Sequence, residues 1–435
     1  MALAGMHYKR RPGLGGEVAP FCFWPLAWRL ARPYKVLSAR YRYSRGAGAP
    51  RPGGARIRFG SAGYDEGPLM KVIAQTAALQ EALSLASSIV AVRTPKPVLQ
   101  CVKLIASGKT LTLLATDLEA GCRFVVSQVE VQAEGEALVP VGKLADIVRE
   151  SAGEESLTIA LEKDACIISG SGSRFRLLGF DPAEYPPVAD FEGAGDFQVS
   201  AQAVSALIER TLFAAARAHS HYAISGVLWE ASGKKLQLVA TDGHRLALAK
   251  TTLSKPAGRE VSAIVPGKLM ALLQRAAGGG EETLAVKVSD SQFLVRTARA
   301  VLVSSLVQGN FPKYSDVIPR DCSRKAVVST AAFLHRIRQA ALLTNEESKS
   351  VRLAFESDKL TLTSRAPETG EAEVTLPAKL TGENLEIGFN PAFLADALKV
   401  VETDEVTVEL SATNKPAVVK SGADFLYVLM PVDLG

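Results

Sequence analysis

The stretch Ala240-Thr-Asp-Gly-His-Arg-Leu-Ala-Leu248 is the best starting point for interpreting this chain. It continues the apolar run Leu236-Gln-Leu-Val-Ala240, which predicts a β-strand. Asp242 and Gly243 predict a tight turn, because an Asp side chain can bond to the backbone amides that follow it and Gly accepts a positive φ. The two leucines after the turn alternate with alanine, which indicates a second strand.

The chain carries three copies of one pattern at a spacing of 125 residues. The Ala-Thr-Asp turn of 240–242 also occurs at 115–117, and the third copy has Thr363-Ser-Arg365 in its place. Each copy contains a helical segment with apolar residues at positions i, i+3 and i+4, which predicts one buried helical face. These triplets are Leu144/Ile147/Val148, Leu269/Leu272/Leu273 and Leu394/Ala397/Leu398. Such regular spacing indicates tandem copies of one structural unit.

Each copy consists of a strand, a helix, several strands, a second helix and further strands. Each first helix begins with a Ser or Thr that can cap its first turn. These helices are predicted at 76–83, 200–208 and 330–337. We therefore predict an α+β fold with two helices packed on antiparallel sheets in each copy. The predicted domains are 70–191, 196–318 and 322–435, with linkers at 186–193 and 312–319.

The composition excludes several classes of protein. Hydrophobic residues make up 47% of the chain and charged residues 22%, as in soluble globular proteins. There is no apolar run of the ~18 residues that a membrane span needs. The five cysteines have no paired metal-ligand spacing and suit a reducing cytosol. No HExxH, Walker A or GxGxxG motif follows a strand, so we expect no metal and no cofactor.

Residues 1–69 differ from the rest of the chain. They are rich in Arg, Gly and Pro, and contain twelve Lys or Arg against three acidic residues, a local net charge of +9. The remaining chain has a net charge of −4, so any contact with nucleic acid must be local. The apolar segment 21–28 is short and broken by Pro25, which makes a signal peptide the weaker alternative. The extension is interpreted as disordered, as a basic tail that touches nucleic acid, or as a misassigned start with Met70 as the true one.

The repeats and their motifs resemble the bacterial DNA polymerase III β subunit, the sliding-clamp family. The resemblance rests on the two Ala-Thr-Asp turns, on 240–248, on Asn310-Phe-Pro-Lys-Tyr-Ser-Asp-Val-Ile-Pro319 and on Tyr427-Val-Leu-Met-Pro-Val432, and it covers 70–435. It implies three clamp-type domains per chain and two chains closed head to tail into a ring around duplex DNA. It also implies a cytoplasmic, nucleoid-associated processivity factor without a catalytic site of its own.

The resemblance places partner docking at the 240–248 turn. The implied partners are the replicative polymerase catalytic subunit, the clamp loader, and repair and translesion polymerases, which insert short apolar peptides. The residues carried over are Ile224, Thr241, Gly243, His244, Arg245, Leu246, Pro312, Val317, Met430, Pro431 and Val432. Asp316 and Asp433 stand where many relatives carry a cation, which is expected to change the peptide preference.

A clamp that slides needs weak phosphate contacts that do not depend on base sequence. The expected DNA-facing helices carry only scattered cations, each of which could also be ordinary solvated charge. The residues expected to face DNA are Arg93, Lys143, Arg149, Arg217, Tyr222, Lys268 and Arg275, with Arg210, Arg336, Arg338 and Lys399 on the same helices. By position in the family, Phe175 of one chain would meet Leu342 and Leu343 of the other in a homodimer.

Two other functions compete with this interpretation. An enzyme would use Asp242 and His244 as an acid–base pair, with Ser220 or Ser225 nearby, but no third orienting group is visible. The turn at 115–117 also lacks the His. A repeat-built scaffold that docks peptides without encircling DNA is the second alternative.

Overall fold

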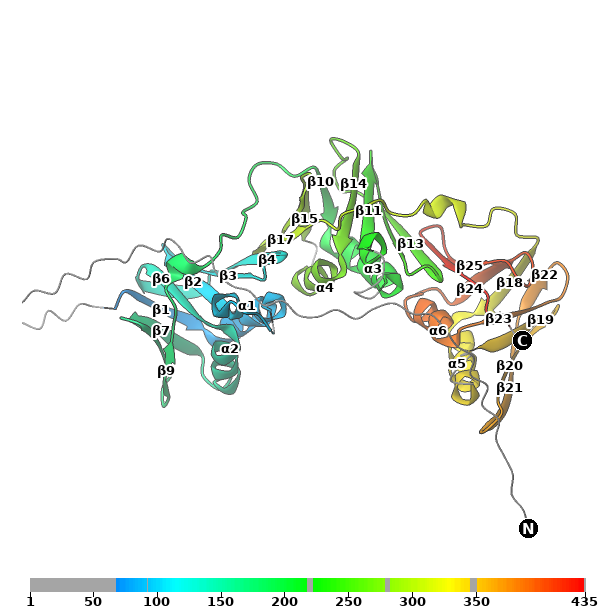
Figure 1. Ribbon diagram of the computed structural model, residues 1–435, viewed down its shortest axis with the longest axis horizontal. Helices are drawn as coiled ribbons and strands as arrows, with labels where there is room; N and C mark the ends of the chain where they lie inside the picture. The colour runs from blue at the N-terminus through cyan, green and yellow to red at the C-terminus, as the bar shows by residue number, and fades with distance from the viewer. Residues whose placement is uncertain (1–67, 92, 217–221, 278–281, 345–349, 434–435) are drawn as a thin grey trace, which may run out of the picture. The chain divides into compact units, whose positions relative to one another are not determined.

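The repeat in the sequence corresponds to three similar sets of strands and helices in the computed structural model (Figure 1). The structure describes residues 68–433 except 92, 217–221, 278–281 and 345–349. The extension predicted for 1–69 therefore lies outside the described residues, apart from its last two positions. We refer to 70–191, 196–318 and 322–435 as the first, second and third domains.

The first domain contains nine strands and two α-helices among its described residues. Its strands are β1 (Met70–Gln75), β2 (Cys101–Ser107), β3 (Thr110–Thr116), β4 (Ala120–Val126), β5 (Val129–Ala133), β6 (Gly135–Pro140), β7 (Ser156–Glu162), β8 (Ala165–Ser169) and β9 (Arg174–Leu178). Its helices are α1 (Thr76–Ile89) and α2 (Val141–Glu150).

The second domain repeats this order. Its strands are β10 (Phe197–Ser200), β11 (Gly226–Ser232), β12 (Lys235–Thr241), β13 (Arg245–Thr252), β14 (Val261–Pro266), β15 (Thr283–Val288), β16 (Gln292–Arg296) and β17 (Ala300–Ser305). Its helices are α3 (Ala201–Thr211) and α4 (Gly267–Ala276), and its 3-10 turns include η4 (Tyr222–Ile224). The turn η5 (Tyr314–Asp316) lies in the linker that follows β17.

The third domain repeats the order once more. Its strands are β18 (Arg324–Ser329), β19 (Val351–Phe355), β20 (Lys359–Ala366), β21 (Gly370–Pro377), β22 (Lys379–Thr381), β23 (Leu385–Phe389), β24 (Glu405–Leu410), β25 (Ala417–Ser421) and β26 (Phe425–Leu429). Its helices are α5 (Thr330–Ala340), the 3-10 turn η6 (Ala341–Leu343) and α6 (Pro391–Lys399).

Two of the antiparallel sheets run without interruption from one domain into the next. One has the order β10-β15-β16-β17-β4-β3-β2-β6, so that β17 of the second domain pairs with β4 of the first. The other has the order β14-β11-β12-β13-β26-β25-β24-β18-β22, so that β13 of the second domain pairs with β26 of the third. We call these pairings the first and second junctions. The sheets β5-β1-β7-β8-β9 and β21-β20-β19-β23 each lie within one domain and end in β9 and β21.

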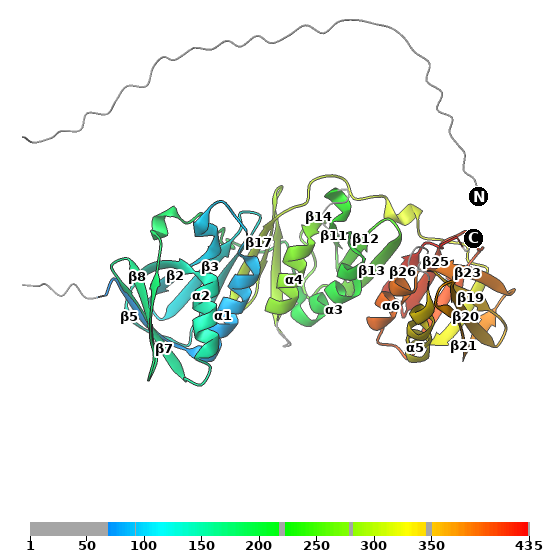
Figure 2. The ribbon, with the colours of Figure 1, turned by 60° about the horizontal axis from the view of Figure 1, so that its bottom comes forward.

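The helices pack in pairs, α1 with α2, α3 with α4 and α5 with α6 (Figure 2). The predicted apolar triplets are buried under these helices, except Ile147, which is half-buried. In the second domain the indole of Trp229 packs edge-on against Phe293, with 5.0 Å between ring centroids, and is fully buried. No helix among the described residues is long and apolar enough to cross a membrane.

The predicted side-chain caps of the first helices are wrong. The residues before α1, α3 and α5 are Gln75, Ser200 and Ser329, and none of them makes a side-chain capping bond. Instead, the first amide of each helix donates to a backbone carbonyl of a neighbouring loop. These bonds run from Thr76 to Glu155, from Ala201 to Glu282 and from Thr330 to Asp404, at 2.8–3.0 Å. The neighbouring loops thus satisfy the first of the amides that have no partner within each helix.

Candidate functional site

The turn between β12 and β13 is held by its own side chains. Gly243 has φ +90°, a conformation that glycine adopts without steric cost. One oxygen of Asp242 accepts the amides of His244 and Arg245 at 3.0 and 3.1 Å. The Thr241 hydroxyl accepts the Gly243 amide and donates to the Arg245 carbonyl. The sequence-based prediction of a tight Asp-Gly turn is confirmed.

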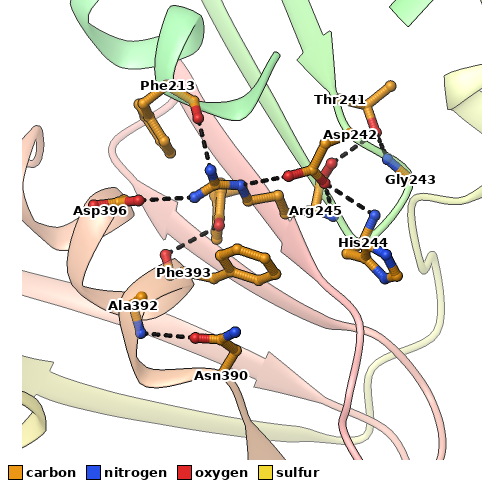
Figure 3. Close-up of polar contacts among 11 residues, drawn as sticks. Phe213, Thr241, Asp242, Gly243, His244, Arg245, Asn390, Ala392, Phe393 and Asp396 are labelled. Atoms are coloured by element: carbon orange, nitrogen blue, oxygen red, sulfur yellow. Dashed lines mark hydrogen bonds and ion pairs between the residues drawn. The ribbon is translucent and has the colours of Figure 1, made fainter. Parts of the chain in front are cut away.

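Arg245 extends from this turn into the second junction, where its guanidinium contacts both domains (Figure 3). Its Nε donates to Asp242 Oδ2 at 3.0 Å, and Nη1 donates to Asp396 Oδ2 on α6 at 3.0 Å. Nη2 donates to the Phe213 carbonyl at 2.7 Å. The guanidinium lies 4.3 Å from the ring centroid of Phe393, close enough for a cation–π contact. The side chain is 10% exposed.

Electrostatic interactions at the second junction keep Arg245 and Asp396 charged. Burial acts to lower the pKa of Arg245, but Tyr427, Asp396 and Asp242 together raise it. Burial acts to raise the pKa of Asp396, but hydrogen bonds from Lys399 and Arg245 hold it below its ordinary value. The result is an ion pair between domains that is charged at neutral pH.

A cavity of about 180 Å³ opens beside this turn, with a mainly apolar lining. It is lined by Ile224, Thr241, Gly243, His244, Arg245, Leu246, Pro312, Lys313, Tyr314, Val317, Val428 and Met430. Nine of the eleven residues expected at a docking groove are therefore brought together. Pro431 and Val432 line a neighbouring cavity of about 560 Å³, together with Asp433. Met430 lines both cavities, so they adjoin.

Sequence reasoning missed Lys313, Tyr314 and Val428 in the first cavity. The sequence does indicate Val428 as a lining residue, because residues two apart on an extended segment share a face and Met430 is one of the expected groove residues. Val428 also pairs with Leu246 across the second junction. Asp316 is exposed on η5 and lines neither cavity, whereas Asp433 lines the second.

Tyr314 anchors the linker that forms one wall of the cavity. Its hydroxyl donates to Glu230 at 2.7 Å and accepts from Gln237 at 2.6 Å. Burial, followed by the Glu230 carboxylate, raises the pKa of Tyr314 to about 12. The phenol therefore stays protonated and holds the linker against β11 and β12 at neutral pH.

Asp242 and His244, the acid–base pair of the enzyme hypothesis, are not hydrogen-bonded to each other through their side chains as such a pair would be. Both carboxylate oxygens of Asp242 are used by the turn and by Arg245. The His244 side chain is exposed, and its backbone carbonyl accepts the Met430 amide at 3.0 Å. Ser220 lies outside the described residues. Among the described residues there is also no group of three His, Cys, Asp or Glu side chains that could hold a metal ion.

The residues expected to face DNA fall into three groups. Lys268 and Arg275 on α4 reach across the first junction, where Lys268 Nζ lies 2.5 Å from Asp117 and Arg275 Nη1 lies 2.5 Å from the Ser88 hydroxyl. Arg149 pairs with neighbours on its own helix. Arg93 and Lys143 are exposed, while Arg217 and the side chain of Tyr222 lie outside what the structure describes.

The residues expected at a dimer interface lie on the edge strand β9 and in the turn η6 beside the edge strand β21. Phe175 is 37% exposed on β9. Leu342 is 80% exposed and Leu343 is half-buried in η6, which packs against β20 and β21. Sequence reasoning missed Leu178, which is 59% exposed at the end of β9.

Comparison with known proteins finds a match in one protein family for each of the three domains. Family models for the N-terminal, central and C-terminal domains of the DNA polymerase III β subunit match residues 70–189, 198–313 and 315–433. The β sliding clamp of Pseudomonas aeruginosa is 32% identical over 362 residues, which are 83% of this chain and 99% of that protein.

Solved structures agree with these matches. The β subunit of Thermotoga maritima is 29% identical, with a TM-score of 0.79 over 84% of this chain and 100% of that one. A P. aeruginosa clamp bound to griselimycin is 32% identical, with a TM-score of 0.79 over 85% of this chain and 100% of that one. The chain belongs to the DNA polymerase III β-subunit family, the bacterial β sliding clamps.

Proposed function

We propose that two copies of this chain close head to tail into a ring around duplex DNA, and that this ring, without a catalytic site of its own, gives a replicative polymerase its processivity. The observation that carries the proposal is the state of the sheet edges. Two junctions are made within the chain, and the strands that would make an equivalent third junction, β9 and β21, lie unpaired at the ends of their sheets.

The repeat identifies β9 and β21 as partners. The strands β4, β13 and β21 begin at residues 120, 245 and 370, so they are the same element of successive copies. By the same spacing, β9 corresponds to β17 and β26. The first junction joins β4 to β17 and the second joins β13 to β26. The remaining pair, β21 with β9, is not made within the chain, and we propose that it forms between two copies.

The equivalence also fixes the register of this third junction. The first junction pairs Ala300 with Phe124, and the second pairs Phe425 with Ala249. The corresponding pair is Phe175 with Val374 of the second copy. Arg176 then faces Glu373 of the second copy, so that opposite charges meet across the strands. Without the second copy, Arg176 contacts Asp164 at 3.4 Å, with both side chains largely exposed.

The solution mass tests this ring. Light scattering across a dilution series is expected to give a dimer of 46.2 kDa chains. Arg176→Glu is expected to weaken the dimer at least about tenfold, because like charges then face each other across the strands. Adding Glu373→Arg is expected to restore it. Lys359→Glu, which changes a charge at the start of β20, is the matched control and is expected to leave the mass unchanged. A persistent monomer would favour the peptide-docking scaffold instead.

We further propose that the two adjoining cavities form one peptide groove for the polymerase catalytic subunit, the clamp loader, and repair and translesion polymerases. Val317 and Met430 are 51% and 42% exposed there, so apolar surface is available to a partner. An apolar anchor would enter the smaller cavity, and the peptide would continue over Met430 into the larger one. Asp433 at that end disfavours peptides with an acidic residue there.

A related clamp binds griselimycin, and we propose that in this chain the compound occupies the groove and can serve as its probe. We expect it to bind the wild-type chain and to lose at least about tenfold in affinity in Val317→Asp, which places a charge in the apolar wall. Leu118→Asp is the matched control, since Leu118 is 56% exposed in the equivalent turn of the first junction. Equal griselimycin affinity in wild type and Val317→Asp would show that the compound binds elsewhere on the chain.

DNA contact is proposed to be weak and independent of sequence, through exposed cations such as Arg93 and Lys399. Such a protein acts on the bacterial chromosome, so we propose that it works in the cytoplasm with the nucleoid. Lys268 and Arg275 are proposed mainly as first-junction residues, because both already bond across that junction.

A further inference from the structure

One carboxylate outside the groove is bonded to a residue that lines it. Asp396 lies on α6 in the third domain and lines neither cavity. Its Oδ2 accepts from Arg245 at 3.0 Å, and its Oδ1 accepts from Lys399 at 2.9 Å. Arg245 belongs to the second domain and lines the smaller cavity. Asp396 is therefore one bond away from the groove, across the second junction.

The guanidinium of Arg245 has little capacity left for a ligand. Its three nitrogens donate to Asp242, to Asp396 and to the Phe213 carbonyl. The Phe393 ring covers one of its faces. An Arg that recognises an anion would leave its paired donors open toward the cavity. Here each of the three nitrogens already donates one hydrogen bond within the protein, so the guanidinium is held in place and forms a fixed part of the cavity lining.

We propose that Asp396 is a positioning residue for the groove, acting through Arg245 to hold the 241–245 turn at a fixed distance from the third-domain wall. The proposal rests on the peptide-groove function above. The smaller cavity has walls from two domains, with Gly243 and His244 on one side and Val428 and Met430 on the other. A change in the second junction therefore changes the width of the cavity, and the Arg245–Asp396 pair opposes such a change.

A second ion pair across the same junction provides an internal control. Arg210 on α3 contacts Glu402 of the third domain at 3.2 Å. Neither residue lines either of the two groove cavities, and Glu402 is 77% exposed. Losing this pair removes an interdomain contact without touching a groove residue. The two acids thus separate a specific effect on the groove from general loosening of the junction.

The experiment measures griselimycin affinity by calorimetry in the full chain, with the dimer mass and melting temperature of each variant recorded. Asp396→Asn keeps the size of the side chain and removes its charge. We expect it to lose about tenfold in affinity, because a charged hydrogen bond to a groove residue is weakened. Glu402→Gln is expected to change affinity by less than about twofold. Asp396→Glu restores the charge and is expected to recover most of the affinity even if Asp396→Asn folds poorly.

A double-mutant cycle tests whether the effect passes through Arg245. In an Arg245→Met background, Asp396→Asn should cause no further loss. Wild-type affinity in Asp396→Asn, an equal loss in Glu402→Gln, or full additivity in the cycle would each overturn the proposal. If the wild-type chain itself fails to bind griselimycin, the groove function is contradicted, and this proposal with it.

Discussion

The two junctions within the chain use the same elements and both are covered by a linker, but among the described residues only the second linker leaves a cavity beside its last residues. The linker segments Tyr185-Pro-Pro-Val-Ala-Asp-Phe191 and Phe311-Pro-Lys-Tyr-Ser-Asp-Val317 align without a gap. In the first, Tyr185, Val188 and Phe191 are all buried against the face of the sheet opposite the helices. In the second, Val317 takes the place of Phe191 and is half exposed.

The fixing points of the two linkers explain this difference. The Tyr185 hydroxyl accepts the Thr116 amide and donates to the Cys101 carbonyl, which holds the first linker over its junction. The corresponding Phe311 has no hydroxyl. The second linker is fixed three residues later, by Tyr314 to Glu230. Val317, which aligns with Phe191, is exposed there and lines the cavity beside the 241–245 turn.

The two junctions also differ in the ion pairs that cross them. At the first junction Lys268 reaches directly to Asp117. At the second, the Asp of the equivalent turn binds Arg245, which continues to Asp396 and forms part of a cavity wall. One structural unit thus forms a plain connection in one place and the lining of a cavity, our proposed peptide groove, in the other, and a few side chains make the difference.

The largest expected effect comes from truncating the aligned residues of the two linkers. Phe191→Ala should lower the free energy of unfolding by about 3 kcal/mol or more, because it empties a buried aromatic site that Arg296 also covers at 4.5 Å. Val317→Ala should cost less than about 0.5 kcal/mol, because the side chain is half exposed. Denaturant unfolding of both variants measures this, and similar losses would mean that the linkers are packed alike.

Ligand binding should show the opposite order for the same two variants. Val317→Ala removes two methyl groups from the cavity wall and should weaken griselimycin binding by up to about tenfold. Phe191→Ala should leave the affinity unchanged, because the first junction has no part in the groove. Fluorescence or calorimetric titration distinguishes the two, and a loss of affinity in Phe191→Ala would contradict the separation of the junctions.

A smaller effect is expected from the first-junction ion pair. Lys268→Met removes the bonds to Asp117 and to the Ile89 carbonyl, both half-exposed contacts. We expect a loss of about 1 kcal/mol in stability and no change in griselimycin affinity. The melting temperature measures the first quantity. A change in affinity as large as that of Asp396→Asn would show that the groove responds to either junction.

The smallest effect concerns pH. The pKa of Asp396 is lower in the folded chain than its ordinary value of 3.8, so the unfolded state binds more protons as the pH falls through this range. Its stabilising contribution should be complete above about pH 5, begin to fall near the ordinary pKa of 3.8, and be lost as the pH falls through the lower pKa of the folded chain. The difference in melting temperature between wild type and Asp396→Asn should accordingly be constant from pH 8 to 5 and should then decrease as the pH falls further. A difference that grows on acidification would contradict the ion pair.

Much of the fold could be predicted from the sequence, because the buried triplets recur at fixed spacing and the Ala-Thr-Asp turn occurs twice at the same spacing. The helices and the strands follow from that pattern, whereas nine residues that line the smaller cavity were expected from the family resemblance. The pattern could not give the contacts between residues distant in sequence, such as Lys268 with Asp117 or Arg245 with Asp396. It also failed at the helix starts, where loop carbonyls replace the predicted Ser and Thr caps. The sequence also could not show which linker leaves a cavity. That depends on whether the last apolar residue of the linker is buried, as Phe191 is, or exposed, as Val317 is, and residue type alone does not reveal this.

The central claim is that β21 of one copy pairs with β9 of another to close a ring around DNA. The most direct test places cysteines at Phe175 and Val374, loads the protein onto a nicked circular plasmid, and oxidises it. The measurement is the protein retained on the DNA in about 1 M salt, where charge contacts are screened. We predict retention on the circle and release once the plasmid is cut to a linear form. Equal retention on circular and linear DNA, or no crosslinked ring at this register, would contradict the account.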